Sequence, residues 1–331
     1  MTQRDEPFVS VVTPVYNGEA FLVECIESVL KQTYQNFEYI IVNNCSKDRT
    51  LEIAKAYAQK DRRIRVHDNT EFVAVIANHN IAFRQISPQA KYCKIVSADD
   101  WLFPDCIKQL VAVAEANPSV GIAGCYQLSG DRIRWQGLAY PTAVVKGRDM
   151  CRRIWLSDPR HTFGFGSPTS LLYRADLVRK NQDFYPNSNP HSDTSACVEH
   201  MQHCNYGFAY QVLSYERVHE QTQSHESLLK NRYSAAWIND LIEYGSHYLS
   251  PEEHRAALTD ALRKYHDYLI SNLGKLKRKN LWEYHRKTLE ELGHPLTVAQ
   301  LVGAAIRKTG RGLLNPGIAI NKLRGRSYPI R

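Results

Sequence analysis

Short apolar runs and longer amphipathic segments alternate along the first 125 residues of the chain. Apolar, β-branched and aromatic residues gather in five runs, which we expect to be strands, at residues 8–13, 37–42, 64–67, 92–96 and 120–125. The segments between them carry apolar residues at helical spacing, at 19–32, 48–59 with Asp48 as the N-cap, 74–86 and 104–116. This alternation predicts an α/β fold, with an open, mostly parallel sheet flanked by helices.

The pattern changes twice further along the chain. After residue 125 it loosens into loops, with a helix near 148–155 and strand-like pieces at 169–173 and 208–215. From about residue 227 the spacing is helical, at 235–248, 251–273, 281–292 and 297–308. We therefore expect one domain of residues 1–225, with halves 1–125 and 126–225, and a helical, basic C-terminal region of residues 226–331.

The charge of the chain is concentrated at its C-terminal end. The formal net charge is +8, yet no Asp or Glu occurs from Gly293 to Arg331, where seven residues are Lys or Arg. Apolar residues such as Leu301, Val302 and Ile306 lie among these cations. Two interpretations stay open: a segment that binds an anionic lipid surface, and a basic end that only aids solubility. We expect no nucleic-acid partner.

Cysteine usage and hydropathy predict the compartment. Eight cysteines, from Cys25 to Cys204, include no CxxC pair, which is typical of buried thiols in a reducing compartment. No apolar run approaches the roughly 18 residues of a membrane helix, and the first residues, MTQRDEPF, lack the layout of a secretory signal. We expect a cytoplasmic protein, with peripheral contact at the cytoplasmic face of a membrane if the basic end binds lipid.

Polar segments follow three of the predicted strands, at 14–19, 43–48 and 97–101. Ligands of open parallel sheets bind beyond the carboxyl ends of the strands, so these segments should meet at one edge. Tyr16 can offer a ring to a base, and Glu19 and Asn44 can bond base or ribose edges. Asp99 and Asp100 can hold Mg²⁺ or Mn²⁺, as a pyrophosphate requires, although such a pair alone is more often a turn or a helix cap.

Three stretches of the chain resemble glycosyltransferase family 2, whose members have the GT-A fold. They are VSVVTPVYNGEAFLVECIESVLKQTYQNFEYIIVNNCSKDRTLEIA, NHNIA at 78–82 and SADDWLFP at 97–104, and the likeness covers about residues 8–220. It implies an inverting transfer of a sugar from a nucleotide-diphosphate donor, with a UDP-sugar favoured, to a hydroxyl of a saccharide or lipid-linked acceptor. Synthesis of cell-surface polysaccharide or glycolipid is the implied setting.

The resemblance also implies roles for individual residues. Residues 1–125 would bind the donor and residues 126–225 the acceptor. The donor-binding residues would be Pro14, Val15, Tyr16, Glu19, Asn44, Asn78, Ser97 and Asp99, and the metal ligands Asp100 and His219. Asp193 resembles the acidic catalytic position before a helix and would be the general base, with Glu199 in reserve. Without the resemblance, Asp193 would be read as an N-cap and His219 as a solvated loop residue.

The chain departs from the family pattern in three places. Asn43 and Asn44 stand where the family usually has two Asp residues, and Ser97 stands where it often has Asp. A neutral Asn44 can still bond a uracil or thymine edge, because its amide both donates and accepts. Ala77 stands where Arg is frequent, so one possible cationic contact to phosphate is missing, which His79, Arg84 or Lys94 could replace.

Rival functions fit the sequence less well. A nucleotidyltransferase usually has a glycine-rich, basic loop after its first strand, and a nicotinamide dehydrogenase has GxGxxG there, whereas PVYNGE is neither. A zinc site of Cys197, His200, His203 and Cys204 matches no familiar spacing. A nucleotide-sugar-binding module that has lost catalysis stays open because of Asn43, Asn44 and Ser97.

Overall fold

The structure is a computed structural model that describes residues 6–134, 138–156, 164–186, 191–218, 232–273 and 279–314. The chain forms two compact units, Met1–His225 and Glu226–Arg331. The first unit is an α/β layer structure and the second is helical.

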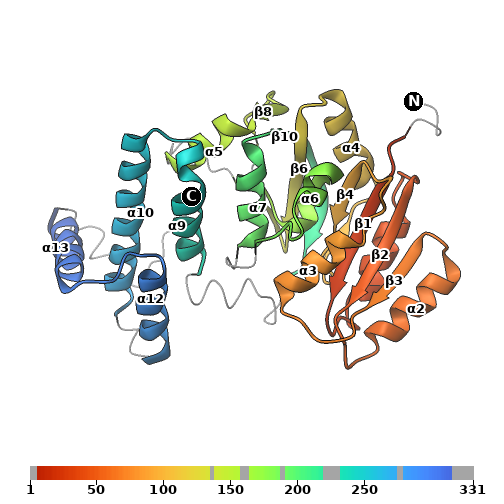
Figure 1. Ribbon diagram of the computed structural model, residues 1–331, viewed down its shortest axis with the longest axis horizontal. Helices are drawn as coiled ribbons and strands as arrows, with labels where there is room; N and C mark the ends of the chain where they lie inside the picture. Colours follow the sequence, from red (N-terminus) through yellow and green to blue (C-terminus); the bar gives the residue numbers. More distant parts are fainter. Residues whose placement is uncertain are drawn as a thin grey trace. The chain divides into compact units, whose positions relative to one another are not determined.

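A single mixed sheet forms the centre of the first unit (Figure 1). Its strand order is β3-β2-β1-β4-β9-β6-β10-β5, with β7 beside β6 and β8 beside β10. The strands are β1 (Val9–Val15), β2 (Phe37–Asn43), β3 (Ile64–Asp68), β4 (Tyr92–Ile95), β5 (Trp101–Leu102), β6 (Val120–Ser129), β7 (Arg132–Arg134), β8 (Val144–Lys146), β9 (Leu171–Arg174) and β10 (Asn205–Glu216). Strands β1 to β4 are parallel to one another, β10 is parallel to β6, and β9 runs antiparallel between β4 and β6. The prediction of a mostly parallel sheet flanked by helices is confirmed.

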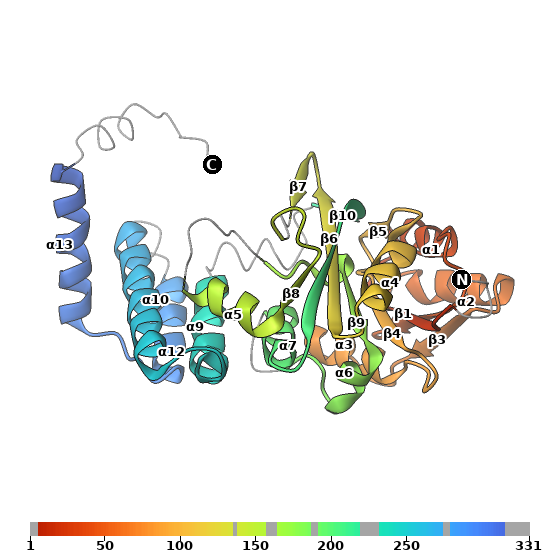
Figure 2. The same cartoon turned by 90° about the horizontal axis from the view of Figure 1, so that it is seen from above.

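Helices cover both faces of this sheet (Figure 2), with α1, α2 and α4 on one face and α3, α6 and α7 on the other. Their bounds are α1 (Leu22–Leu30), α2 (Thr50–Lys60), α3 (Val75–Arg84), α4 (Cys106–Ala116), α5 (Gly147–Trp155), α6 (Ala175–Lys180) and α7 (Ser192–Met201). In α1, Leu22, Cys25, Ile26 and Val29 are fully buried in the main core. Their spacing of three and four residues places them on one face, which explains why this segment is helical.

The structure corrects the sequence prediction in detail. Strands β5, β7 and β8 were not predicted, because each has two or three residues and no apolar alternation. Helix α2 begins at Thr50 with Arg49 as its N-cap, so Asp48 is not the N-cap. Asp48, one residue before the N-cap, still accepts a hydrogen bond from the Thr50 amide at 3.0 Å. All eight cysteines are free thiols, and seven are buried while Cys45 is partly exposed.

The second unit packs its helices around a small core of its own. The helices are α9 (Arg232–Tyr244), α10 (Pro251–Ser271), α12 (Lys279–Glu291) and α13 (Val298–Leu314). Ala235, Ile238, Tyr265, Leu269 and Leu289 form the core. The start of α10 is stabilised by a capping box between Ser250 and Glu253. No helix among the described residues is long and apolar enough to cross a membrane.

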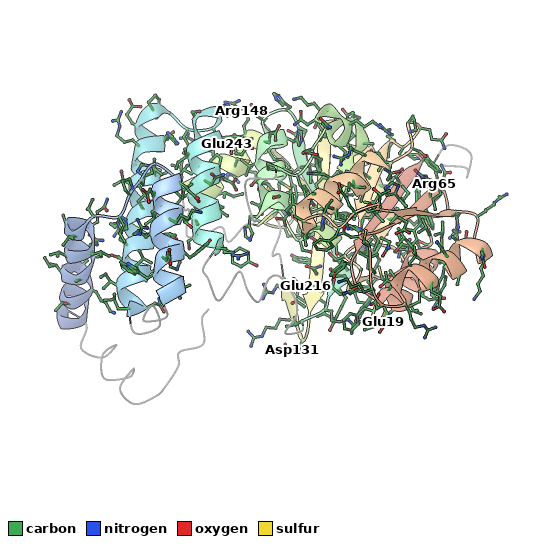
Figure 3. All side chains as sticks on the ribbon, turned by 60° about the horizontal axis from the view of Figure 1, so that its bottom comes forward. Glu19, Arg65, Asp131, Arg148, Glu216 and Glu243 are labelled. Atoms are coloured by element: carbon green, nitrogen blue, oxygen red, sulfur yellow. The ribbon has the colours of Figure 1, made fainter. Side chains whose placement is uncertain are left out.

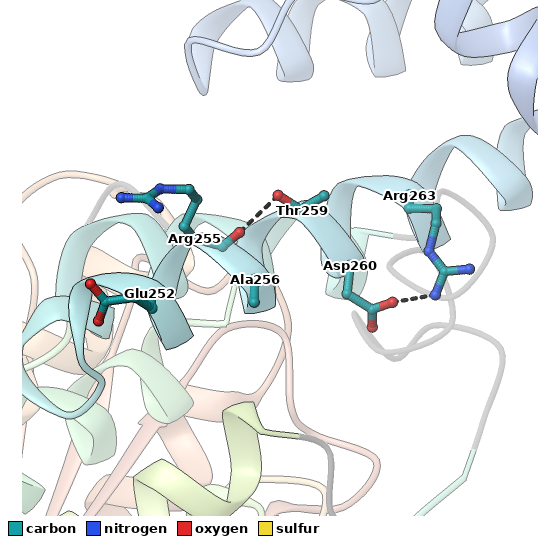
Figure 4. Close-up of a pocket in the computed structure, with 6 residues that line it drawn as sticks. All are labelled: Glu252, Arg255, Ala256, Thr259, Asp260 and Arg263. Atoms are coloured by element: carbon teal, nitrogen blue, oxygen red, sulfur yellow. Dashed lines mark hydrogen bonds and ion pairs between the residues drawn. The ribbon is translucent and has the colours of Figure 1, made fainter.

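A shallow depression lies on the surface of α10 (Figure 4), lined by Glu252, Arg255, Ala256, Thr259, Asp260 and Arg263. Its polar groups contact each other: Thr259 donates to the Arg255 carbonyl at 2.8 Å, and Arg263 pairs with Asp260. These contacts are ordinary helix-surface pairs, and the depression lacks the buried polar groups of a ligand site.

Candidate functional site

The loops after β1 and β2 interlock at the carboxyl edge of the sheet. The Asn17 amide donates to Ser46 Oγ at 2.9 Å, the Gly18 amide to Thr50 Oγ1 at 2.7 Å and the Glu19 amide to Asp48 Oδ2 at 3.0 Å. Glu19 follows β1, Glu216 is the last residue of β10, and Arg65 lies near the start of β3. Figure 3 shows Glu19 and Glu216 on one side of the unit and Arg65 on the opposite side. The polar segments after β1 and β2 therefore meet at one edge, as the strand ends predict.

Two aromatic rings stand exposed at this edge. Tyr16 is 42% exposed and Phe72 is 60% exposed, and their ring centroids lie 4.9 Å apart at an interplanar angle of 61°. Pro14 and Val15, which precede Tyr16, are buried in β1. An exposed aromatic pair beside polar loops can bind the face of a nucleobase. Phe72 was missed because it lies in a loop with no motif.

Asn44 is bound to a loop of the protein itself. It is 1% exposed, its Nδ2 donates to the Val73 carbonyl at 2.9 Å, and its Oδ1 accepts from the Val73 amide at 3.0 Å. Asn69 Nδ2 bridges Asn44 and Asn78 at 3.1 and 2.9 Å, and Asn78 is 4% exposed. Asn44 and Asn78 thus support the loop that carries Phe72, and their predicted contacts with the donor stay a prediction.

Asp100 is a buried carboxyl group at the end of the segment after β4. It is 6% exposed, its Oδ2 accepts from Thr169 Oγ1 at 2.6 Å, and its Oδ1 accepts from the Arg217 amide at 3.0 Å. The pKa of Asp100 is raised to about 8. Burial is the main cause, and the charge of the neighbouring Asp99 is the second. Among the described residues, the surroundings of Asp100 therefore favour its protonated form over the ionised carboxylate.

This carboxyl pair fits a hard divalent cation. Mg²⁺ and Mn²⁺ prefer oxygen ligands and are often held by one or two carboxylates together with substrate phosphates. Asp99 and Asp100 supply such oxygens, and a cation would supply the charge that buried Asp100 lacks. Within the described residues no group of three or more His, Cys, Asp or Glu side chains is arranged to hold a metal ion, so donor phosphates would complete the coordination. His219, the other predicted ligand, lies outside the described residues.

Thr169 and Lys94 hold Asp100 in place from the sheet interior. Thr169 Oγ1 accepts from the Ser97 amide at 3.1 Å while it donates to Asp100. Lys94 is fully buried, and its Nζ donates to the Leu171 carbonyl at 3.0 Å, the Ile95 carbonyl at 3.2 Å and the Thr169 carbonyl. Lys94 thus fixes the segment that carries Thr169, and its ammonium does not reach a phosphate at the edge.

Arg217 brings a positive charge to the same place. Its Nε donates to the Asp99 carbonyl at 3.0 Å, and its guanidinium pairs with Glu24. The guanidinium carbon also lies over the rings of Phe21 and Trp101, at 4.5 and 5.0 Å from the ring centroids. Arg217 was not predicted from the sequence, although it follows β10 as the other site residues follow their strands.

Asp193 lies in the first turn of α7, whose N-cap is His191. Asp193 is therefore not the N-cap, although a carboxylate in the first turn of a helix also interacts favourably with the helix dipole. Helix α7 leads directly into β10, so it runs opposite to β10 and its first turn lies toward the edge where β10 ends. Glu199 lies six residues later, ~9 Å along the helix, and accepts from Asn181 at 2.9 Å. Glu199 is thus farther from the site than Asp193.

The sequence of the chain matches that of known enzymes. The model of the family described as "Glycosyl transferase family 2" matches residues 10–180. Glycosyltransferase GlyG of Streptococcus pneumoniae is 28% identical over 254 residues, 73% of this chain and 79% of that protein. The uncharacterized glycosyltransferase EpsJ of Bacillus subtilis is 38% identical over 129 residues, and the match spans only 36% of that protein.

Solved structures share the fold. Staphylococcus aureus TarS in complex with UDP-GlcNAc superposes with a TM-score of 0.60 at 16% identity, over 86% of this chain and 80% of that one. Mannosyltransferase PcManGT from Pyrobaculum calidifontis, in complex with GDP-Man and Mn²⁺, has a TM-score of 0.56 at 16% identity. The match covers 94% of this chain and 81% of that one. At such identities the likeness concerns the fold, and it confirms the GT-A type architecture predicted from the sequence.

Proposed function

This chain belongs to glycosyl transferase family 2 and is a glycosyltransferase, and we propose that it performs a metal-dependent, inverting transfer from a UDP-sugar to an acceptor hydroxyl. The observation that carries the proposal is the burial of the Asp100 carboxyl group, which raises its pKa; Asp100 follows a strand, as the exposed Tyr16 does. Such a group is costly to the fold and is typical of a site that binds a cation with its substrate.

The donor would bind over the interlocked loops. Tyr16 and Phe72 would contact the uracil ring, with Asn44 and Asn78 behind them and Ser97 and Asp99 toward the ribose and sugar. The complex of TarS with UDP-GlcNAc supports uracil as the base, since that protein shares the fold.

Asp100 and Asp99 would hold Mg²⁺ or Mn²⁺, with His219 as the proposed further ligand. When bound, the cation offsets the charge that develops on the departing diphosphate. The chain itself contributes orientation: Thr169 and the Arg217 amide each bind one oxygen of Asp100, so the carboxylate is held before the donor arrives. The complex of PcManGT with GDP-Man and Mn²⁺ supports this cation in a related fold.

Asp193 would remove the proton of the acceptor hydroxyl as that oxygen attacks the anomeric carbon. Its carboxylate makes no hydrogen bond or ion pair among the described residues and is half-buried, so it is open to an incoming hydroxyl. A single displacement of this kind inverts the anomeric configuration.

The acceptor is proposed to be a saccharide or a lipid-linked saccharide used for cell-surface polysaccharide or glycolipid synthesis, on the cytoplasmic side. Helix α13 supports a lipid surface as a partner. Val298, Val302 and Ile306, four residues apart on α13, are 77%, 51% and 66% exposed. Within the described residues Arg307 of the same helix pairs with Asp267, so the cations for lipid would come from the residues after it.

Two rival functions are less well supported. Nucleotidyl transfer lacks its glycine-rich basic loop after β1, where Asn17 and Gly18 instead bind the β2 loop. A module without catalysis would not need a carboxyl group as costly as Asp100. The relatives are named as glycosyltransferases, which favours the enzyme.

A panel of nucleotide sugars, screened by thermal shift with and without Mn²⁺, tests the proposal. We expect a UDP-sugar to raise Tm most, and only with Mn²⁺, with the Mn²⁺ effect lost in Asp100→Asn and kept in the control Asp131→Asn, an exposed aspartate of the β6–β7 turn. A Tm that no nucleotide sugar changes, or equal responses of wild type and Asp100→Asn, would contradict it.

A further inference from the structure

Three tyrosine rings gather where β6, β10 and the segment before β8 meet. The ring of Tyr210 lies 5.5 Å from that of Tyr140 and 6.4 Å from that of Tyr126, measured between centroids. The interplanar angles of these pairs, 77° and 61°, are typical of edge-to-face contacts. The buried ring of Phe208 contacts both Tyr126 and Tyr210, at 5.0 and 5.3 Å. We call Tyr126, Tyr140 and Tyr210 the tyrosine cluster.

The tyrosine cluster is open to solvent. Tyr140 is 83% exposed, and Tyr126 and Tyr210 are partly exposed. The ring of Tyr140 thus contributes little to the core, since most of its surface stays in water. A single scattered apolar residue on a surface needs no explanation, but a group of adjoining exposed rings is typical of a binding surface.

The segment that carries Tyr140 is held on β10. The Tyr210 hydroxyl donates to the Thr142 carbonyl at 2.6 Å, and the Phe208 amide donates to the Ala143 carbonyl at 2.8 Å. Burial raises the pKa of Tyr210, so its phenol keeps the hydrogen that it donates to Thr142. Tyr140 is therefore presented on a fixed segment before any ligand arrives, which lowers the entropy cost of binding.

Strand β10 leads from the tyrosine cluster to the proposed cation site. Seven residues after Tyr210, the Arg217 amide donates to Asp100 at 3.0 Å. Seven strand residues span ~23 Å, somewhat less at the β-bulges of β10. Figure 3 shows Asp131, in the turn after β6, and Glu216, the last residue of β10, on one side of the unit. Along the strand, the cluster thus lies several sugar units from the cation site.

A saccharide matches the chemistry of this surface. A sugar ring has C–H groups on its faces and hydroxyls at its edge. A tyrosine offers a ring face of negative potential, which attracts C–H groups, and a phenol that bonds hydroxyls. The cluster lies in residues 126–225, the half of the unit that is predicted to bind the acceptor, and its distance from the cation site is too long for one sugar.

We propose that the tyrosine cluster is an acceptor subsite that binds one unit of an extended saccharide, several units away from the hydroxyl that receives the transferred sugar. The inference rests on the proposed function and names its acceptor as a chain of sugars. Tyr140 contacts the face of the bound unit, and the chain runs along β10 toward the cation site. The cluster contributes to binding of long acceptors and leaves the chemical step unchanged.

Binding to an array of oligosaccharides of increasing length tests the inference. We expect wild type to bind long members of a series more tightly than the single sugar. Tyr140→Leu, which keeps an apolar side chain and removes the ring, should lose roughly 2- to 10-fold in affinity for the long members, as for one aromatic contact. Tyr140→Phe should keep most of the affinity. Phe72→Leu, which changes the exposed ring near Tyr16, is the matched control and should bind glycans as wild type does.

Steady-state kinetics with the longest glycan that binds give the second readout. Tyr140→Leu should raise KM for this acceptor and leave kcat and the KM of the UDP-sugar unchanged. Wild type and Tyr140→Leu with equal affinity for every glycan, or an equal loss for single sugars and long chains, would overturn the inference. A dimer of wild type that Tyr140→Leu dissociates would also overturn it, since the cluster would then be an interface between two copies. Glycan binding that needs Tyr140, in a protein that transfers no sugar, would overturn the proposed function alone.

Discussion

The hydroxyl of Thr169 donates a 2.6 Å hydrogen bond to Oδ2 of Asp100. Thr169 belongs to residues 126–225, the predicted acceptor half, and Asp100 belongs to residues 1–125, the predicted donor half. The bond therefore joins the two halves at the carboxyl group that is proposed to hold the cation. Lys94 donates a hydrogen bond to the backbone carbonyl of Thr169. The Thr169 hydroxyl is therefore held in position before any ligand binds.

Thr169→Val should weaken binding of Mn²⁺ with UDP roughly 10- to 100-fold, because a hydrogen bond to a charged group contributes about 1.5–3 kcal/mol. The valine keeps the shape of the side chain and removes only the donor. Calorimetric titration measures the affinity, with Thr259→Val on α10 as the control. Unchanged affinity in Thr169→Val would show that the bond does not support the cation site.

The sequence predicts the parts of this site that lie along single strands. Tyr16, Asn44, Asp99 and Asp100 each follow a strand, and the strand-end rule for parallel sheets suffices to bring them together. Thr169 and Arg217 meet Asp100 across 69 and 117 residues, and no local pattern reports such contacts. The sequence also cannot tell what the side-chain amide of Asn44 binds. In the structure the backbone of Val73 binds both of its polar atoms.

Asn44→Asp should lower the stability of the first unit. The new carboxylate would face the Val73 carbonyl without a hydrogen to donate, which leaves a buried acceptor unpaired at a cost of about 1–3 kcal/mol. We expect a lower Tm and weaker UDP binding, since the loop that carries Phe72 loses its anchor. A variant as stable as wild type that binds UDP more tightly would show that residue 44 contacts the base and not the loop.

The double variant Val302→Ser with Ile306→Ser should lose binding to vesicles that contain anionic lipid, at low salt. Burying exposed valine and isoleucine contributes about 1.5–3 kcal/mol each, so the partition coefficient should fall by more than tenfold. Val23→Ser, which changes a 43% exposed valine on α1, is the control. Equal vesicle binding by all three proteins would exclude α13 as a lipid-binding helix.

His200 should make the first unit sensitive to acid. Its ring is fully buried and stacks on Phe184 at 5.2 Å, and neither ring nitrogen has a hydrogen-bond partner among the described residues. Burial lowers the pKa of His200 to about 4 from an unfolded value near 6.5. The unfolded chain therefore binds the proton first, and the free energy of unfolding should fall as pH decreases from about 6.5 to about 4, by roughly 3 kcal/mol.

His200→Phe keeps the stack on Phe184 and removes the titrating group. Between pH 4 and 6.5, the unfolding free energy of His200→Phe should depend less on pH than that of wild type. Above pH 7, the pH dependence of the two proteins should differ least. Urea denaturation at several pH values measures this difference. Parallel pH profiles of His200→Phe and wild type between pH 4 and 6.5 would contradict the assignment.

The proposed function depends above all on Asp193 as the general base of an inverting sugar transfer. Turnover of Asp193→Asn tests it most directly, measured as release of nucleoside diphosphate together with the anomeric configuration of the wild-type product. We expect donor binding to survive, turnover to fall by about 10²- to 10⁴-fold, and the new linkage to have the configuration opposite to that of the donor. Near-normal turnover of Asp193→Asn, or a product that retains the donor's configuration, would contradict the account.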